Sequence, residues 1–575
     1  MNYTINNKDE NCSIVIENTR ECDGVTFLDI KLNYEKEQVP SSFSLKWKFP
    51  AIDVFSTWSP DFGGSHRLLP NWSKQRTNSR LACMMPIHQL VSLSGRNRLN
   101  ISLSDAVTPT CISTGICEED ACFDCDITFF TVPVAAIREY RATVRIDMRD
   151  IPYYDSIYDV SEWWERSCGY ENMNVPESAR LPMNSLWYSY HQMLDVEDII
   201  KECRLSKPLG MDTVIIDDGW QTDDNNRGYA FCGDWELATK KIPDMKDFVR
   251  RIHEIGMKVM LWYSVPNMGI KSKNYEEYKD MLLDQSGNCR DFWSLDPRYK
   301  KVRDFLINTY ADAVEKWELD GLKLDFIDAF VLRGKSLEPD ERRDFVSLED
   351  GIDALMTGVK ERLSKINPDI MIEFRQNYVG PAIRKYGNMF RVADCPNDAI
   401  VNRTEIVNLR YTSGKAAVHS DMLMWHPDDP VESAALELAN TIYAVPQISV
   451  KLDKLPEDHK KMLAFYLSFW REHRDVLLDG KLTARNPESD YSIVCSEMDK
   501  KAVISCYTNN LCDLALFDSA VIVNASAQCE IIIKNAVGAS YKVVNCMGEK
   551  IACGTIKGNL DEIKVPCAGM IFITK

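Results

Sequence analysis

Long apolar runs and an excess of basic residues are missing from the sequence. Its first twenty residues carry no basic segment followed by an apolar one, so we expect no signal peptide. No run of about 18 apolar residues occurs, which excludes an ordinary transmembrane helix. Basic residues are outnumbered, 68 against 86 acidic ones, and the net charge of −18 argues against nucleic acid or an anionic membrane as a partner. We therefore expect a cytoplasmic protein with a small, neutral ligand, and a homo-oligomer is compatible with this composition.

Low-complexity segments and repeat arrays are also absent, whereas cysteine is abundant. A chain of 575 residues is longer than a domain with one hydrophobic core usually is, so two or three domains are expected. The 19 cysteines are an odd number and fit thiols of a reducing compartment. Cys111, Cys117, Cys122 and Cys125 could hold zinc, but their spacing lacks the two C-x₂-C pairs of a structural zinc site. We expect neither a metal nor a cofactor.

The rhythm of apolar residues divides the chain into three parts. Residues 1–175 alternate strand-like runs with polar turns, as at 142–146, and predict an N-terminal β-sandwich. Residues 176–478 alternate apolar strands with amphipathic helices. Residues 479–575 return to short strands, which predicts a small C-terminal β-sandwich.

The number of predicted strands in the middle part and its length fit a closed barrel. About eight strands fit into roughly 270 residues, the dimensions of a (β/α)₈ barrel. The predicted strands are 185–187, 213–216, 259–262, 321–324, 370–372, 390–392, 417–418 and 448–450. We therefore predict an α/β protein with a central TIM barrel between two β-sandwich domains.

Charged side chains stand where four of these strands end. They are Asp217 and Asp218 after the second strand, Lys323 and Asp325 at the fourth, Arg375 after the fifth, and Arg391 and Asp394 at the sixth. The βα loops of a barrel meet on one face, so we expect these side chains to lie close together. Asp325 stands between Leu324 and Phe326 and should be enclosed, and a buried charge needs a partner. Lys323, two residues earlier on the same strand face, can supply it.

Two carboxyl groups at neighbouring strand ends suit glycoside cleavage. Retaining enzymes place them about 5–5.5 Å apart, and the fourth and sixth strands are near neighbours, so Asp325 and Asp394 can converge. A single aspartate at a strand end is more often a helix cap or an ion-pair partner. Caps at Asp217 and Asp218 and a loop-fixing ion pair at Arg391 are the alternatives. Four charged strand ends at one barrel mouth favour a catalytic site, with its reaction type open.

Short motifs at the strand ends resemble those of glycoside hydrolase family 36 and its sister family 27. Residues 214–221 (VIIDDGWQ) resemble the aspartate-pair motif, and residues 321–326 (GLKLDF) resemble the K-x-D strand. Residues 390–394 (FRVAD) resemble the R-x-x-D segment, and 233–235 (GDW) and 295–298 (LDPR) are also similar to family 36. The matches keep the family's order over most of residues 180–450. The resemblance implies a retaining, α-galactosidase-like glycosidase with the three-domain layout predicted above.

Carried over onto the matching positions, the resemblance implies roles for the strand-end residues. Asp325 would be the nucleophile and Asp394 the general acid/base. Asp217 and Asp218 would accept hydrogen bonds from the 4- and 6-hydroxyls of a galacto-configured sugar. Lys323 would contact the 3- and 4-hydroxyls.

Further residues complete the implied substrate site. Arg391 would face the 2-hydroxyl side, and Arg375 is a further substrate-binding candidate. Trp220, Trp235 and Trp262 are candidates for stacking on the sugar, with core packing as the alternative for each. Two carboxylates supply nucleophile and proton, so no cofactor is required.

Two segments depart from the family pattern. After the fifth strand, α-galactosidases carry a cysteine- and glycine-rich segment, whereas residues 372–377 read IEFRQN. The C2 substituent of the sugar is therefore open, and an α-N-acetylgalactosaminidase is an alternative. The acid/base segment reads DCPND, one residue longer between its aspartates than is common. Asp394 keeps the R-x-x-D relation to Arg391, so it is preferred to Asp398.

Two other functions compete with hydrolysis. A raffinose-synthase-like α-galactosyl transferase would share the aspartate pair, and a catalytically silent glycan-binding protein is a remote alternative that the paired carboxylates argue against. His419, Ser420 and Asp421 do not form a catalytic triad, because adjacent residues of a strand point to opposite faces. We expect a substrate-lining or core role for them.

Overall fold

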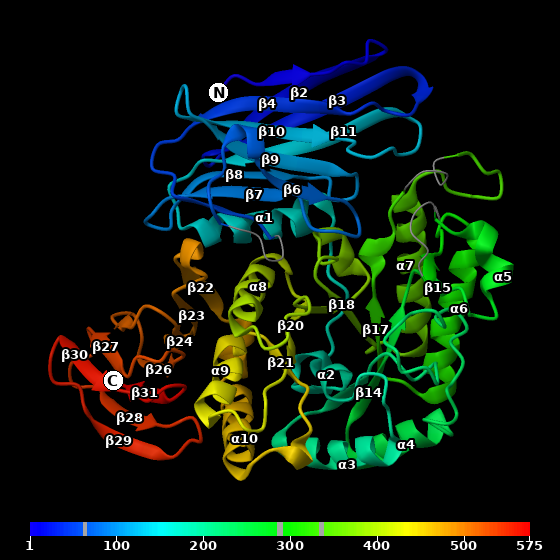
Figure 1. Ribbon diagram of the computed structural model, residues 1–575. Helices are drawn as coiled ribbons and strands as arrows, with labels where there is room; N and C mark the ends of the chain where they lie inside the picture. The colour runs from blue at the N-terminus through cyan, green and yellow to red at the C-terminus, as the bar shows by residue number, and fades with distance from the viewer. Residues whose placement is uncertain (61–65, 284–290, 333–337) are drawn as a thin grey trace.

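The computed structural model describes residues 1–60, 66–283, 291–332 and 338–575. Three groups of sheets follow one another along the chain, and helix α1 (Tyr153–Cys168) lies between the N-terminal sheets and the barrel (Figure 1). The C-terminal strands lie beside the barrel, next to its last helices. The predicted order of β, α/β and β parts is confirmed.

Two antiparallel sheets form the N-terminal part. Their strand orders are β1-β4-β10-β9-β6 and β2-β3-β11-β8-β7-β5. Side chains alternate between core and solvent, and both sheets contribute to one core that includes Leu28, Leu45, Ile127 and Val144. The strands are β1 (Thr4–Asn6), β2 (Cys12–Cys22), β3 (Val25–Gln38), β4 (Phe43–Pro50), β5 (Ser56–Trp58), β6 (Gln75–Ser79), β7 (Ile87–Val91), β8 (Asn97–Leu103), β9 (Thr110–Cys117), β10 (Cys122–Phe129) and β11 (Ile137–Asp147).

A closed barrel of parallel strands forms the middle part, as predicted. Its strands are β12 (Met183–Ser185), β13 (Thr213–Ile216), β14 (Lys258–Ser264), β17 (Gly321–Asp325), β18 (Met371–Arg375), β19 (Met389–Arg391), β20 (Ala417–Leu423) and β21 (Val445–Ile448). The other elements are α2 (Trp187–Tyr190), α3 (Val196–Ser206), α4 (Met245–Ile255), β15 (Asn267–Gly269), α5 (Tyr275–Tyr278), β16 (Phe292–Ser294), α6 (Lys300–Trp317), α7 (Leu348–Ile366), α8 (Ala399–Thr412), α9 (Val431–Thr441), α10 (Glu457–Glu472) and α11 (Arg474–Asp479).

The first and last barrel strands are displaced from their predicted positions. The first strand was predicted at 185–187, but Trp187 begins α2, and the strand instead uses the polar pair Asn184 and Ser185. The last strand ends at Ile448 rather than running over 448–450. Both shifts arise because barrel strands can bury polar side chains, which a search for apolar runs passes over.

Methionines fill the barrel interior near the beginnings of the strands. Met183, Met260, Met371 and Met389 form one fully buried cluster there. Gly321 starts β17 beside them, and a Cβ at this position would lie 2.6 Å from the Met371 carbonyl oxygen. This end of the barrel is packed solid, so a ligand site belongs at the opposite end.

The C-terminal part consists of a seven-stranded and a three-stranded sheet. Its strands are β22 (Lys481–Arg485), β23 (Ile493–Met498), β24 (Lys501–Cys506), β25 (Leu511–Asp513), β26 (Ser519–Asn524), β27 (Glu530–Lys534), β28 (Ser540–Val544), β29 (Lys550–Thr555), β30 (Leu560–Lys564) and β31 (Met570–Thr574). The hairpin predicted at 545–549 joins β28 to β29. The domain boundaries near residues 175 and 478 stay a prediction.

Within the described residues, no helix is both long and apolar enough to cross a bilayer. The four cysteines considered for zinc lie on β9 and β10, where Cys117 pairs directly with Cys122. In the same described part, no three His, Cys, Asp or Glu side chains are arranged to hold a metal ion. The cytoplasmic location and the homo-oligomer stay predictions.

Candidate active site

Asp325 lies at the end of β17 and is held by four hydrogen-bond donors. Its Oδ1 atom accepts from Arg375 Nε at 2.8 Å, from the Tyr378 hydroxyl at 2.6 Å and from the Phe326 backbone N–H at 2.9 Å. Its Oδ2 atom accepts from Trp262 Nε1 at 3.0 Å. The Asp325 side chain is only 8% exposed, so the donors replace the water that an exposed carboxylate would bind.

These contacts keep Asp325 ionised. Burial acts to raise its pKa, but the charges of Arg375 and Lys323 and the hydrogen bonds from Tyr378 and Trp262 outweigh burial. The pKa of Asp325 is therefore held well below its ordinary value. An ionised, enclosed carboxylate is what a nucleophile requires.

Lys323 does not pair with Asp325 in the way that the sequence predicted. Its Nζ atom donates to Asp217 Oδ2 at 2.6 Å, and both side chains are 4% exposed. The ion-pair partner of Asp325 is Arg375, from the next strand. The predicted direct pair is therefore wrong, but the charge of Lys323 still helps to lower the pKa of Asp325.

The aspartate pair after β13 forms part of a compact loop rather than a helix cap. The next long helix, α4, is capped by Asp244 instead. Asp217 Oδ1 accepts from the Asp218 backbone N–H at 2.9 Å. Gly219 adopts a φ of +114°, and a Cβ there would meet Gln192 Cα at 2.5 Å. Glycine is therefore required directly after the pair.

Two glutamine amides hold Asp218. Gln192 donates to its Oδ2 atom at 2.7 Å, and Gln221 donates to its Oδ1 atom at 2.6 Å. The carbonyl oxygens of both amides accept backbone N–H groups, of Arg227 and Gly219, so the amide nitrogens are turned toward Asp218. Each carboxylate oxygen keeps a further lone pair for another donor.

Burial raises the pKa of Asp218 to about 6, although the two glutamines act to lower it. The neighbouring charge of Asp217 adds to the increase. Asp218 is therefore a strand-end carboxyl whose protonation changes near pH 6.

Arg391 lies at the centre of a second cluster, at the end of β19. Its Nη2 atom donates to Asp394 Oδ1 at 2.8 Å, and its Nη1 atom donates to Asp421. Glu373 Oε1 lies 3.7 Å from the Arg391 Nε atom. Asp421 also accepts from the Tyr188 hydroxyl at 2.9 Å. The ion pair of Arg391 with Asp421 thus matches the loop-fixing alternative. The contact of Arg391 with Asp394 in addition orients a candidate catalytic group.

Asp394 is the accessible carboxyl of the pair. Its side chain is 49% exposed, against 8% for Asp325. Burial acts to raise its pKa, but the charges of Arg391, Lys323 and Arg375 outweigh it and lower the pKa below its ordinary value. The charge of Asp325 opposes this decrease, which places the two carboxylates within electrostatic range of each other.

Asp398, the alternative acid/base residue, has a structural role. Its side chain accepts from the Val401 backbone N–H at 3.0 Å and caps α8. The geometry therefore favours Asp394.

The three tryptophans belong to one aromatic cluster. Trp220 is fully buried, donates from Nε1 to the Trp262 carbonyl oxygen at 2.8 Å and stacks on Trp235 with ring centroids 6.1 Å apart. These contacts favour core packing for Trp220. Trp262 is committed to Asp325 through its Nε1 atom. Sugar stacking by Trp235 and Trp262 stays a prediction.

Several residues of the site were not predicted from the sequence. Tyr378 contacts Asp325, Tyr188 contacts Asp421, and Gln192 and Gln221 orient Asp218. Gln221 could have been found, because it lies inside the aspartate-pair motif. His419 Nε2 donates to the Ala179 carbonyl oxygen at 2.8 Å, whereas Asp421 pairs with Arg391, so the three neighbours form no triad.

Carboxyl groups outnumber cations at the strand ends. The carboxyl groups are those of Asp217, Asp218, Asp325, Glu373, Asp394 and Asp421, and the cations are Lys323, Arg375 and Arg391. Burial raises the pKa of Glu373 and of Asp421. With six carboxyl groups and three cations, the site favours a ligand that develops positive charge.

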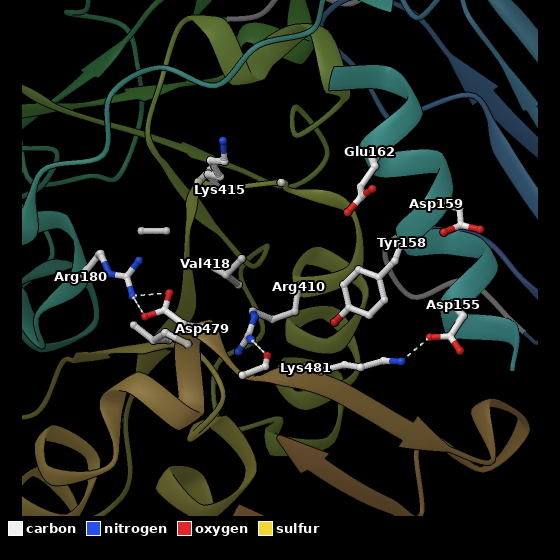
Figure 2. Close-up of a pocket in the computed structure, with 15 residues that line it drawn as sticks. Asp155, Tyr158, Asp159, Glu162, Arg180, Arg410, Lys415, Val418, Asp479 and Lys481 are labelled. Carbon is white, nitrogen blue, oxygen red and sulfur yellow. Dashed lines mark hydrogen bonds and ion pairs between the residues drawn. The ribbon is translucent and has the colours of Figure 1, made fainter. Parts of the chain in front are cut away.

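A separate cavity of about 560 Å³ lies where α1, the start of β20 and the start of β22 meet (Figure 2). Four of its charged side chains form two ion pairs, Arg180 with Asp479 and Lys481 with Asp155. Arg410 lines the cavity and donates to the carbonyl oxygens of Tyr443 at 2.7 Å, Gly480 at 3.3 Å and Leu477. This arrangement connects the barrel to the C-terminal sheets.

Replacement of Arg410 by methionine is expected to destabilise this junction. The carbonyl oxygens would lose their shared donor, at a cost of about 1–3 kcal/mol for each group left buried and unpaired. The temperature of thermal unfolding should fall by several degrees, whereas Arg166→Met, on a side chain that is 75% exposed, should leave it unchanged. Equal melting curves for Arg410→Met and wild type would contradict this role.

The barrel and its strand-end site place the chain among (β/α)₈ proteins with a polar site at the carboxyl face. Residues 182–480 match the family model described as Melibiase. The chain therefore belongs to the melibiase family, and the resemblance to glycoside hydrolase family 36 is confirmed.

Relatives of known activity match parts of the chain. The α-galactosidase Mel36A of Lactobacillus acidophilus is 30% identical over 127 residues, 21% of this chain and 17% of that protein. The α-galactosidase AgaA of Geobacillus stearothermophilus is 23% identical over 312 residues, 51% of this chain and 41% of AgaA. The matched segments thus span less than half of either relative. The solved α-galactosidase of Lactobacillus brevis shares the fold, with a TM-score of 0.66 and 13% identity over 100% of this chain and 85% of its own.

Proposed function

We propose that the protein is a retaining exo-α-glycosidase that removes terminal α-linked galactose, or a closely related galacto-configured sugar. The observation that carries the proposal is that two carboxyl groups of the site differ in burial and in their partners. Asp325 is enclosed and held ionised, whereas Asp394 is half-exposed and oriented by Arg391. The family and the α-galactosidase activity of the relatives support the same reaction.

In the proposed mechanism, Asp325 attacks the anomeric carbon while Asp394 gives its proton to the departing oxygen. Asp394 then takes a proton from water, and this water displaces Asp325, so the configuration is retained. The excess of carboxyl groups over cations at the site favours the oxocarbenium-like transition states of both steps. In the free protein the acid form of Asp394 is disfavoured, and a sugar that displaces its water would raise its pKa.

Asp217 and Asp218 supply the proposed selection for the galacto configuration. Each carboxylate is fixed by protein donors and keeps lone pairs for the 4- and 6-hydroxyls. A site built to bond a hydroxyl rejects an analogue that cannot reach it, because a buried acceptor is then left unpaired. Lys323 fixes Asp217 in this arrangement.

Galactose binding is expected to weaken as the pH falls through 6. Asp218, with a pKa raised to about 6, loses its charge below this value and becomes a poorer hydrogen-bond acceptor. If only the ionised form binds, Kd should rise about tenfold between pH 8 and pH 5. Calorimetric titration with galactose checks this directly, and Asp218→Asn should bind weakly at every pH. An inflection near pH 6 that persists in Asp218→Asn would assign the titration to another group.

The experiment that tests the proposed function compares aryl α-galactoside with its α-N-acetylgalactosaminide counterpart and follows the anomeric configuration of the product by NMR. Fast release of α-galactose from the first substrate supports the proposal. Preference for the second substrate would identify an α-N-acetylgalactosaminidase, and predominant transfer to added sugar would identify a transferase. Absence of turnover with both, despite galactose binding, would indicate a glycan-binding protein.

A further inference from the structure

The two oxygen atoms of Asp325 have unequal surroundings, and this asymmetry carries a consequence for the reaction. We propose that Arg375 and Tyr378 hold Oδ1, leave Oδ2 as the attacking atom, and stabilise the carboxylate as it departs from the sugar in the second step. The inference rests on the proposed function. It assigns roles to Arg375, in the segment 372–377 that departs from the α-galactosidase pattern, and to Tyr378, which directly follows that segment.

The hydrogen-bond pattern distinguishes the two oxygens. Oδ1 accepts from Arg375, Tyr378 and the Phe326 backbone N–H, which occupy its lone pairs. Among the described residues, Oδ2 accepts one hydrogen bond, from Trp262 Nε1. One lone pair of Oδ2 is therefore left to form a bond, and the Trp262 indole fixes the orientation of that atom.

Arg375 is itself held in place. Its guanidinium carbon lies 5.1 Å from the centroid of the Phe326 ring and 5.5 Å from that of Tyr378. Its Nη1 atom donates to the Gln376 carbonyl oxygen at 3.0 Å. The side chain is 16% exposed, so its charge acts on Asp325 with little screening by water. A fixed cation at this distance contributes most when Asp325 carries a full charge.

Because Arg375 stabilises the charged form of Asp325, it affects the two chemical steps in opposite directions. In the first step an Oδ2 lone pair forms the bond to the anomeric carbon, the glycosidic bond breaks, and its electron pair leaves on oxygen with the proton of Asp394. Asp325 loses charge, so Arg375 opposes this step. In the second step water attacks, its proton goes to Asp394, and the pair of the C–Oδ2 bond returns to Asp325, so Arg375 and Tyr378 assist.

Removal of the guanidinium should therefore slow the second step selectively. A hydrogen-bonded charge of this kind corresponds to about a 10- to 100-fold effect on the rate constant. For Arg375→Gln we expect the deglycosylation rate constant to fall by this factor, while the glycosylation rate constant is unchanged or higher. A pre-steady-state burst of nitrophenolate from nitrophenyl α-galactoside should grow, KM should fall, and kcat should lose its dependence on the leaving group.

Two further variants make the experiment decisive. Tyr378→Phe removes one donor from Oδ1 and should give the same pattern with a smaller effect. This variant tests the same inference if Arg375→Gln does not fold. Tyr263→Phe is the matched control, because its buried hydroxyl has no hydrogen-bond partner among the described residues. Both rate constants of Tyr263→Phe should equal those of wild type.

The outcomes separate this inference from the proposed function. Loss of glycosylation alone, or equal loss of both rate constants in Arg375→Gln and Tyr378→Phe, would overturn the inference. A higher KM with both rate constants intact would assign Arg375 to sugar binding instead. Failure of the proposed function would appear earlier, as a wild-type protein that forms no covalent glycosyl-enzyme.

Discussion

Replacement of Asp325 by alanine is expected to reduce kcat for an activated α-galactoside by at least about 10⁴-fold, because it removes the nucleophile and no other carboxylate occupies its position. The four donors around Asp325 would then surround a small empty space. Added azide can enter this space and attack the anomeric carbon in place of the carboxylate. The rescued product should therefore be β-galactosyl azide, which has the inverted configuration.

The matched control is Asp353→Ala, in a 43% exposed carboxylate that pairs with Lys385 on the barrel surface. Its kcat should be that of wild type. Circular dichroism and thermal unfolding establish that both variants are folded, because loss of Asp325 also leaves Arg375 without its ion-pair partner. Unchanged turnover by Asp325→Ala would remove the nucleophile assignment.

Replacement of Asp394 by alanine is expected to separate substrates by their leaving groups. A poor leaving group needs the proton, so its glycosylation should slow by about 10²- to 10⁴-fold. A good leaving group departs without a proton, so its glycosylation should be almost unchanged and deglycosylation should limit kcat. Stopped-flow kinetics with a series of aryl α-galactosides measures this separation. Added azide should accelerate turnover and give the retained α-azide, because azide needs no general base.

Asp398 provides the control for this experiment within the same segment. Because Asp398 is the N-cap of α8, its replacement by alanine should lower the free energy of unfolding by about 1 kcal/mol. The leaving-group dependence of Asp398→Ala should match that of wild type. If instead Asp398→Ala slowed only the substrates with poor leaving groups and Asp394→Ala did not, the acid/base role would belong to Asp398.

The barrel and its carboxylates could be predicted because they depend on local sequence. Strand 213–216 is a continuous apolar run ended by Asp217 and Asp218, and the structure places β13 over the same residues. Residues at the carboxyl ends of parallel strands must lie on one face. The grouping of Asp325, Asp394, Arg375 and Arg391 therefore followed from strand order alone.

The contacts between these residues could not be predicted, because they depend on side chains from distant segments. Lys323 is two residues from Asp325, yet it donates to Asp217, 106 residues away. Tyr378 reaches Asp325 from the loop after β18, and nothing in its local sequence distinguishes it from a core tyrosine. Strand register and side-chain rotamers decide such pairs, and neither is readable from spacing.

The N-terminal strands illustrate the same limit for the fold. Alternation of apolar residues in 142–146 indicated a half-buried strand, and these residues lie in β11. The pairing of β11 with both β3 and β8 requires contacts between segments about 40 to 120 residues apart, which no local pattern encodes. Architecture was thus predictable, whereas strand order was not.

Identification of the residue that becomes bonded to the sugar is the most direct measurement. A fluorinated α-galactosyl fluoride that forms a slowly hydrolysed glycosyl-enzyme would be incubated with the wild-type protein, and the labelled peptide would be sequenced by mass spectrometry. We expect a single adduct on Asp325. An adduct on any other residue, or release of product with inverted configuration and no adduct, would contradict the double-displacement mechanism.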